Sequence, residues 1–395
     1  MSELSPTLRS KKLIQELRAQ GRKVYNFGLG ENPMPPSPQF VKLVQEYASE
    51  KGYASCEGVP TLNRALKGIY DTAETQYGIV VGNGLKELLF VIQTAFKGKI
   101  IHITPSWVSY REHIEILQRE EDLIELRTTI DQSYKIKPEQ LEECLQNTQY
   151  TPVLLIFNNP NNPTGISYTN SELRDISNVI GKYANVAVLA DEIYANLCHN
   201  GDVVSISKYL PKQTIRGSSV SKDLSCGGYR VGWMAFPDTL DTLFRKCCNY
   251  ASRIYSCASV PVQHATGAIL CNKRLCQELF NSQAKHFGQI TETLLAQLKD
   301  TELQWVKPDA AWYVFLCFDN YRDQLYNQGI KDSVTLATHL LKQHGISTIA
   351  GKYFDMESTS LTLRFAFVDF PEDQNKIAHM KEGLDMLKEF LRKLS

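Results

Sequence analysis

The stretch Ser219-Val220-Ser221-Lys222-Asp223-Leu224-Ser225-Cys226-Gly227-Gly228-Tyr229-Arg230 carries the strongest indication of fold and function, because it places one lysine among hydroxyls and glycines, eight positions before an arginine. A solvated lysine is protonated at neutral pH, so a lysine that attacks a carbonyl needs surroundings that free its amine. The small neighbours leave room for a flat ring, while Ser219, Ser221 and Arg230 offer donors for a phosphate. By itself, the same composition also fits a flexible surface loop.

Two stretches upstream argue against a surface loop. The apolar run Val153-Leu154-Leu155-Ile156 predicts a buried strand, and it leads into the turn Asn158-Asn159-Pro160-Asn161-Asn162-Pro163-Thr164-Gly165. A second apolar run, at 185–190, ends in Asp191-Glu192-Ile193-Tyr194. Ligands of open α/β sheets bind where parallel strands end. Asp191 is therefore predicted at the mouth of a sheet, with Glu192 facing the opposite way because side chains alternate along a strand.

The Asn-Asn-Pro-Thr-Gly turn, the Asp-Glu-Ile-Tyr strand end and the Ser-x-Ser-Lys loop resemble, in this order, the fold type I aminotransferases that use pyridoxal 5'-phosphate (PLP). The resemblance covers nearly the whole chain and is greatest to the class I/II branch with aspartate, aromatic and kynurenine aminotransferases. It implies an α/β fold, in which a large domain has a mostly parallel sheet wrapped by helices and a smaller domain is α+β. We expect residues 1–45 to join the small domain, 46–285 to form the large PLP-binding domain, and 286–395 the small C-terminal domain.

The resemblance also implies roles for the residues at the strand ends. Lys222 would be the Schiff-base lysine and the base that moves a proton at the substrate. Asp191 would hold the ring nitrogen of PLP protonated, so that the ring can accept electrons. Tyr194 and Asn162 would both hydrogen-bond the 3'-oxygen of the ring. Asp191 by itself could also be a surface acid at a strand end.

A cradle for the phosphate is predicted at 79–90, where a short strand, a glycine turn and an apolar helical pattern follow one another. Free backbone amides and the helix dipole at such a helix start favour an anion. The resemblance places the phosphate on Gly84, Leu85 and Lys86, with Ser219, Ser221 and Arg230 as further contacts. It also places Trp107, in the segment after the strand at 100–103, flat against the pyridine ring. Without the resemblance, Gly82-Asn83-Gly84 would be an ordinary turn.

The substrate carboxylate needs a bidentate partner, and Arg364 lies in the alternating stretch Leu361–Phe367. An arginine among apolar residues is costly to bury unless an anion meets it, and that anion is either the substrate or a neighbouring acid. The resemblance favours the substrate, with Gly30 in a segment that closes over it and with Trp107 and Asn162 also in contact. It further implies that Tyr53 reaches the active site of a second subunit, so the chain is predicted to be a homodimer.

The predicted activity is the transfer of an amino group from an amino acid to a 2-oxo acid by a ping-pong mechanism. The same fold also supports C–S lyases, other eliminations and decarboxylations, since the fate of the carbanion decides the reaction. A DNA-binding regulator built on this fold is disfavoured, because such proteins carry an extra basic region ahead of the segment near Phe27. Substrates with a second carboxylate would need another cation, for which Arg253 is a candidate, although a surface position is the simpler expectation.

Composition sets the remaining expectations. The 43 basic and 43 acidic residues balance, so no general electrostatic case for binding nucleic acid arises. Ten scattered cysteines, with no Cys-x-x-Cys pair and no histidine spacing for zinc, fit reduced thiols in the cytoplasm. Residues 1–22 lack the apolar core of a signal peptide, and no apolar run approaches the roughly 20 residues of a membrane helix. We therefore expect a soluble cytoplasmic enzyme.

Overall fold

The computed structural model describes residues 6–201, 203–368 and 376–394. Residues 1–5 of the predicted N-terminal segment, residue 202 of the predicted large domain, and residues 369–375 and 395 of the predicted C-terminal domain lie outside the described residues. Within the described ranges, no helix is both long and apolar enough to cross a membrane.

The described part of the chain contains a seven-stranded sheet with the order β2-β8-β7-β6-β5-β3-β4. Its neighbours are parallel except that β8 runs antiparallel to both β2 and β7. The predicted, mostly parallel sheet is therefore confirmed. The strands are β2 Tyr77–Gly82, β3 Lys99–Thr104, β4 Leu123–Arg127, β5 Val153–Asn158, β6 Val186–Asp191, β7 Thr214–Ser219 and β8 Gly232–Pro237.

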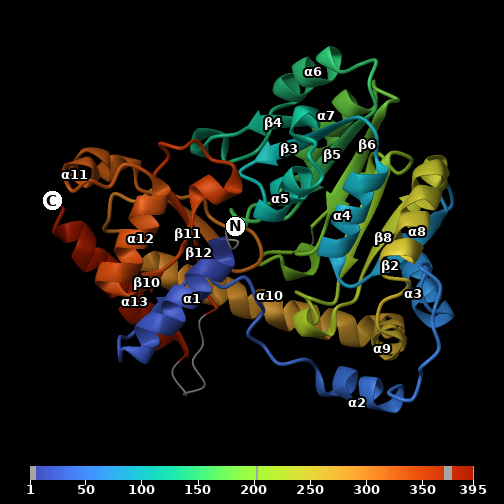
Figure 1. The fold of residues 1–395 in the computed structure, drawn as a ribbon, viewed down its shortest axis with the longest axis horizontal. Coiled ribbons are helices and arrows are strands. Elements are labelled where there is room, and N and C mark those ends of the chain that lie inside the picture. The colour runs from blue at the N-terminus through green and yellow to red at the C-terminus, as the bar shows by residue number, and fades with distance from the viewer. Residues whose placement is uncertain (1–5, 202, 369–375, 395) are drawn as a thin grey trace.

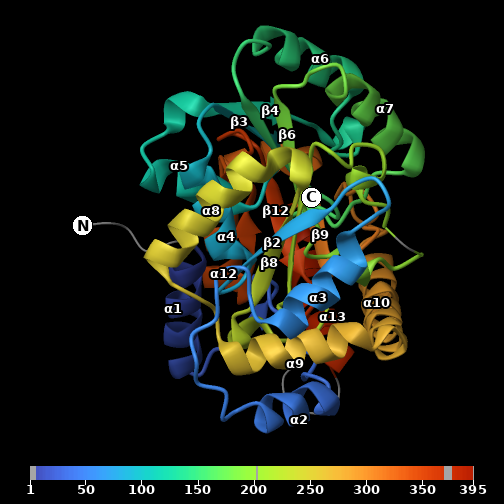
Figure 2. The same cartoon turned by 90° about the vertical axis from the view of Figure 1, so that its right-hand side faces the viewer.

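Helices cover both faces of this sheet, so its strands are buried and read as nearly continuous apolar runs. One face packs on α4 Leu85–Ala95, α5 Val108–Ile116 and α8 Asp241–Ile254. The opposite face packs on α6 Pro138–Asn147 and α7 Asn170–Ile180 at one side, and on α2 Pro38–Glu46, α3 Pro60–Tyr70 and α9 Val260–Cys271 at the other. Figure 2 shows α3, α8 and α9 around the β2–β8 side of the sheet.

A second, smaller body lies beside this sheet, at the left of Figure 1. Its antiparallel sheet has the order β11-β12-β9, and a separate pair joins β1 to β10 in parallel. These strands are β1 Tyr25–Asn26, β9 Tyr313–Cys317, β10 Ile346–Ser347, β11 Ile349–Ala350 and β12 Thr362–Ala366. The accompanying helices are α1 Pro6–Ala19, α11 Arg322–Asn327, α12 Ser333–His344 and α13 Lys376–Arg392. Because β1 pairs with β10, residues 25–26 pack with the C-terminal part of the chain, whereas α2, which begins within the predicted N-terminal segment, packs in a core of the large sheet.

Helix α10, Lys273–Ala296, connects the two bodies as one long ribbon (Figure 1). It contains the predicted boundary between residues 285 and 286, and its buried side chains include Cys276 near one end and Leu294 near the other. Cys276 packs in the core around α3 and α9, whereas Leu294 packs in the core of the smaller body. The exact division into domains stays a prediction.

The parallel strands end together at one edge of the large sheet. In the register of β5 and β6, Asn158 lies opposite Asp191, and Asp191 lies opposite Gly217 of β7. The turn with Asn162, the acid Asp191 and the loop with Lys222 all follow these ends, so the backbone places all three at the same edge.

Candidate active site

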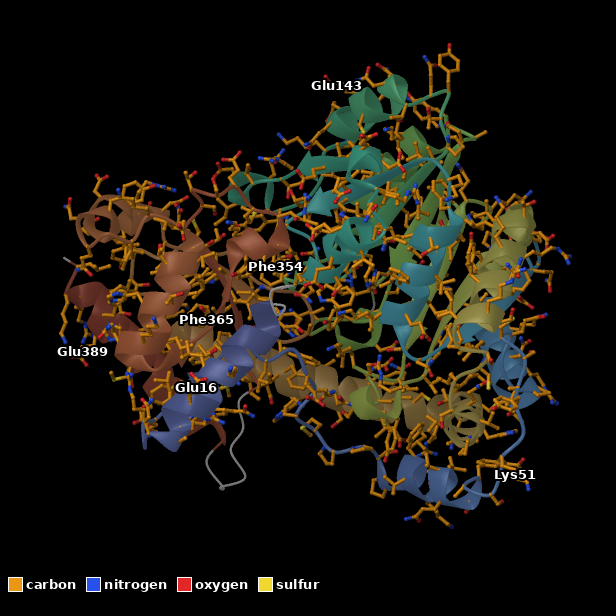
Figure 3. The ribbon with its side chains drawn as sticks, in the orientation of Figure 1. Glu16, Lys51, Glu143, Phe354, Phe365 and Glu389 are labelled. Carbon is orange, nitrogen blue, oxygen red and sulfur yellow. The ribbon has the colours of Figure 1, made fainter. Side chains whose placement is uncertain are left out.

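A cavity of about 530 Å³ is lined by residues from both bodies of the protein. Phe354, one of its lining residues, lies at the junction between the two bodies in Figure 3. The predicted site residues that line it are Gly30, Leu85, Lys86, Trp107, Asn162, Asp191, Tyr194, Ser221, Lys222, Arg230 and Arg364. The fold thus brings together residues that are widely separated along the chain.

Lys222 lies in the loop after β7 and is half-buried. Its Nζ donates a hydrogen bond to the carbonyl oxygen of Gly30, and it lies 5.8 Å from the ring centre of Tyr194. The backbone oxygen of Lys222 accepts a hydrogen bond from Nδ2 of Asn32 at 2.6 Å. The segment around Gly30 is therefore held against the lysine from two sides.

Asp191 is buried at the end of β6, where its carboxylate accepts hydrogen bonds from the Tyr110 hydroxyl at 2.6 Å and from the Ile193 amide at 3.2 Å. Burial raises the pKa of Asp191 to about 6, although the hydrogen bond from Tyr110 opposes this shift. Glu192 faces elsewhere and pairs with Arg216 at 2.8 Å. No cation among the described residues forms an ion pair with the Asp191 carboxylate, so this carboxylate suits a ligand that brings a positive charge.

The start of α4 forms a cradle with Arg230. Gly84 caps the helix with φ +88°, and a Cβ at Gly84 would lie 2.5 Å from Nη2 of Arg230. Arg230 donates to the carbonyl oxygens of Asn83 at 2.7 Å and Gly227 at 2.8 Å. Backbone amides at the helix start and an arginine therefore share one corner of the cavity, which is chemistry that suits a phosphate.

Arg364 of β12 is buried, and its guanidinium donates to Oδ1 of Asn162 and to the carbonyl oxygen of Gly28, both at 3.0 Å. Its Nε has no hydrogen-bond partner, and no acid pairs with it among the described residues. Burial lowers the pKa of this guanidinium. The sequence left open a structural ion pair as the alternative to substrate binding. No acid in the described part of the chain forms such a pair with Arg364.

Two tyrosines of the cavity escaped the sequence analysis. Tyr110, which holds Asp191, lies three residues after Trp107 at the start of α5, and this helical spacing was a usable signal. The Tyr313 hydroxyl lies 3.0 Å from that of Tyr194. Tyr313 lies diagonally across from Arg364, since Ala366 pairs with Tyr313 in the register of β12 and β9.

Three predicted site residues lie outside the lining of this cavity. Gly84 lies directly against Arg230, which does line the cavity. Ser219 is fully buried, and its hydroxyl accepts the amide hydrogen of Ser221, so it supports the loop from behind. Tyr53 is 92% exposed, and in Figure 3 the nearby Lys51 lies well apart from Phe354, which lines the cavity. Arg253 is exposed on α8 and also lies outside the lining.

Residues 22–379 match the family model "Aminotransferase class I and II", which spans most of the chain. The chain belongs to the class I and II aminotransferases. The family uses PLP, and its members transfer an amino group from an amino acid to a 2-oxo acid. The resemblance stated above and the predicted transaminase activity are thereby confirmed.

Individual relatives agree with this assignment. The chain is 28% identical to an asparagine–oxo-acid transaminase of Streptococcus mutans, over 96% of this chain and 97% of that protein. It is also 28% identical to an aspartate aminotransferase of Bacillus sp. (strain YM-2), over 90% of each chain. The fold resembles an aspartate aminotransferase from Rhizobium meliloti, with a TM-score of 0.86, 20% identity and coverage of 100% of this chain and 97% of that one.

The residues of the cavity fit PLP. The orphaned, buried Nε of Arg364 and the buried carboxylate of Asp191 provide one site for an anion and one for a cation. In the same cavity, Lys222 presents an amine, and the start of α4 with Arg230 presents phosphate donors. These four features match the carboxylate of an amino acid, the ring nitrogen, the aldehyde and the phosphate.

Gly232→Ala is expected to weaken PLP binding roughly tenfold or more. A Cβ at Gly232 would lie 2.4 Å from the backbone nitrogen of Leu85 and 2.6 Å from the backbone carbon of Gly84, so the start of α4 has to move. Equilibrium dialysis of PLP measures the effect. Gly68→Ala, with nothing within 4 Å of the new Cβ, is the control. Unchanged affinity in Gly232→Ala would exclude this start of α4 as the phosphate cradle.

Asp191→Asn is expected to change how the stability of the cofactor-free protein depends on pH. In the wild type, the pKa of Asp191 rises from 3.8 in the unfolded chain to about 6 in the folded protein. Protonated Asp191 therefore stabilises the folded state, and this stabilisation is lost as the pH rises through both values. From about pH 3 to about pH 7, a range that crosses both pKa values, the wild type loses roughly 3 kcal/mol that the variant keeps. Urea unfolding of both proteins across this range measures the difference, and parallel curves would contradict the predicted linkage.

Proposed function

We propose that Lys222, Asp191 and Arg364 form the catalytic centre of this aminotransferase, with the roles that the sequence analysis gave them. One observation carries the proposal: the amine of Lys222 and the acid-free guanidinium of Arg364 face the same cavity. An amino acid with its carboxylate on Arg364 presents its amino group and α-carbon to the inside of the cavity. This is the geometry that a transaminase requires.

When bound, PLP supplies an aldehyde that takes up the amino group and a ring that accepts the electron pair left at the α-carbon. Lys222 would hold the cofactor through Nζ, then remove the proton from the α-carbon and return it. The aromatic rings of Tyr194 and Trp312 lie 5.8 and 5.6 Å from Nζ. They limit the water around the amine and keep it near one position.

Asp191 would hold the protonated ring nitrogen, which offsets the cost of burying its carboxylate. Tyr110 fixes the orientation of that carboxylate through the 2.6 Å hydrogen bond. The amides at the start of α4, together with Ser221 and Arg230, would bind the phosphate. Ser219 would act indirectly, since its hydroxyl accepts the Ser221 amide hydrogen at 3.1 Å.

Arg364 would bind the carboxylate of both the amino donor and the 2-oxo acid. Its present partners, Asn162 and the Gly28 carbonyl, are neutral acceptors, so an incoming carboxylate offers a stronger bond. The contact with Gly28 also ties the guanidinium to the segment that contains Gly30. Substrate binding and the position of this segment are therefore coupled, which helps to exclude water during the reaction.

Aspartate and asparagine are the first amino donors to test, since the relatives described above carry these names. Arg253 is exposed on α8, so it gives no support for a second carboxylate in this cavity. The cytoplasm remains the proposed location, supported by the ten cysteines, which all lie in the described part of the chain and form no disulfide there.

We further propose a homodimer in which Tyr53 completes the phosphate site of the partner. The side chain is 92% exposed, and its loop is anchored on β2 by a hydrogen bond from the Val81 amide to the Cys56 carbonyl, at 2.8 Å. A large aromatic side chain is rarely left this exposed on an anchored loop unless another molecule covers it, so these two observations favour a contact of Tyr53 with a second subunit.

Lys222→Ala is expected to reduce transamination at least about 100-fold, because a positioned proton-transfer base typically contributes about 100- to 10,000-fold. Lys222→Arg should not restore activity, since a guanidinium stays protonated. The assay follows aspartate, asparagine, alanine and aromatic donors with 2-oxoglutarate, pyruvate or oxaloacetate. Borohydride reduction of the PLP-loaded wild type should label Lys222. The control is Lys182→Ala, which removes an exposed lysine paired with Glu142. A label at another lysine would refute the assignment.

Tyr53→Ala is expected to weaken PLP binding, and mixing should reveal that the tyrosine acts across the dimer. A mixed dimer of Tyr53→Ala and Lys222→Ala subunits holds one site with both Lys222 and the other subunit's Tyr53. At limiting PLP, the mixture should regain activity that neither variant has alone. Tyr150→Ala is the matched control, because Tyr150 is also 92% exposed. A monomer in sedimentation, or no recovery on mixing, would contradict the proposal.

A further inference from the structure

The hydroxyl of Tyr313 lies between two parts of the active site. It lies 3.0 Å from the hydroxyl of Tyr194 and 3.4 Å from the carbonyl oxygen of Gly30, so its one hydrogen can point to either oxygen, and the contact with Tyr194 is the shorter of the two. Tyr313 is 1% exposed, so water does not compete for this hydroxyl. It therefore links the phenol that faces the cofactor to the segment that covers the substrate.

Packing holds Tyr313 in this position. Its ring lies 4.5 Å below the guanidinium of Arg364 and meets the Tyr194 ring edge-on, with 5.6 Å between centres. A Cβ at Gly30 would lie 3.1 Å from the Tyr313 hydroxyl, so the absence of a side chain there permits the close approach. The hydroxyl cannot move away without disturbing Arg364 or Tyr194.

The charges around the two phenols differ. Lys222 and Arg364 both act on Tyr313, whereas Tyr194 is subject to Arg364 and to the negative charge of Asp191; the Glu31 carboxylate lies towards Gly227. Burial alone would raise the pKa of Tyr313, but the two cations, together with the side-chain hydrogen bonds to Tyr194 and Trp312, outweigh burial and lower it. Burial and the neighbouring Tyr313 raise the pKa of Tyr194 well above its usual value.

We propose that Tyr313 is a positioning residue that acts on the cofactor through Tyr194, by donating its hydroxyl hydrogen to the Tyr194 oxygen. The inference rests on the proposed contact of Tyr194 with the 3'-oxygen of PLP. A hydroxyl that accepts a hydrogen bond becomes a better donor, because consecutive hydrogen bonds polarise one another. Tyr313 thus strengthens the hydrogen bond that Tyr194 donates, and stabilises the ionised form of that oxygen.

The test is a pH titration of the absorbance of PLP bound to the wild type, Tyr313→Phe, Tyr194→Phe and the double variant. The midpoint is the pH at which half of the absorbance change of bound PLP has occurred. Tyr313→Phe should raise this midpoint by about half a pH unit to one pH unit, which corresponds to the free energy of one hydrogen bond. Tyr194→Phe should move it further, and the double variant should match Tyr194→Phe, because Tyr313 acts through that residue. Tyr321→Phe is the control. It removes a buried hydroxyl that accepts the Glu302 amide hydrogen in the same body of the protein, so its midpoint should equal that of the wild type.

A second readout needs no cofactor. The tyrosinate absorbance of the cofactor-free wild type should include one tyrosine that ionises below the usual range, and Tyr313→Phe should lose it. This measurement also shows whether the variant has kept its fold, since burial holds the pKa of Tyr110 and Tyr194 well above the usual value, and these phenols ionise at lower pH only after unfolding.

Three results would overturn the inference: a Tyr313→Phe midpoint equal to that of the wild type, a downward shift, or a shift that adds in full to that of Tyr194→Phe. If Tyr194→Phe shifts the midpoint and Tyr313→Phe does not, the proposed contact of Tyr194 with PLP stands and only the role of Tyr313 fails. If neither variant shifts it, both the contact and the inference fail.

Discussion

The burial of Arg364 with no acidic partner in the described part of the chain is the constraint on which the arrangement of the site depends. A buried guanidinium loses its hydration, which costs free energy. In the described structure, hydrogen bonds to two neutral oxygens and contacts with the rings of Tyr313 and Phe354 offset this cost only in part. These groups belong to the large sheet's turn, the N-terminal segment and the smaller body. One side chain therefore draws three distant segments to the same wall of the cavity.

Asp191 presents the opposite charge in the same cavity, and it too is held by neutral groups. The two charges do not pair with each other, so each keeps its capacity for a ligand. A ligand with a cationic ring and a carboxylate would satisfy both charges at once. Under the proposed function, the ring of PLP would meet Asp191 and the carboxylate of the amino acid would meet Arg364, so both components would be needed to fill the site.

Much of the site was readable along the chain, because its residues follow strand ends and turns of distinctive composition. Asp191 ends a buried strand, Asn162 and Lys222 come shortly after buried strands, and parallel strands end at a common edge. Tyr110 and Tyr313 were missed for a physical reason. Tyr110 lies in a helical pattern where an aromatic residue reads as core, and Tyr313 lies in a strand that is buried on both faces, so no alternation marks the side that faces the cavity.

The sequence also misplaced the side chain of Ser219. Its position in the lysine loop suggested a phosphate contact, but the side chain lies behind the loop, where it holds the Ser221 amide. Local composition indicates that hydroxyls are available, whereas the direction of each depends on the backbone path of the loop. The contact between Tyr53 and a second subunit depends on an assembly and stays a prediction.

The amino-acid sequence by itself determined the order of strands and turns, the family, and the residue types that meet the cofactor, since these depend on local periodicity and on short motifs. Only the tertiary structure decided which hydroxyls and charges come together: Tyr194 and Tyr313 are 119 residues apart along the chain, yet their oxygens lie 3.0 Å apart. Hydrogen bonds require placement to within a few tenths of an ångström, and packing between separate elements provides it. A local pattern sets only which face a residue occupies, so it cannot set that distance.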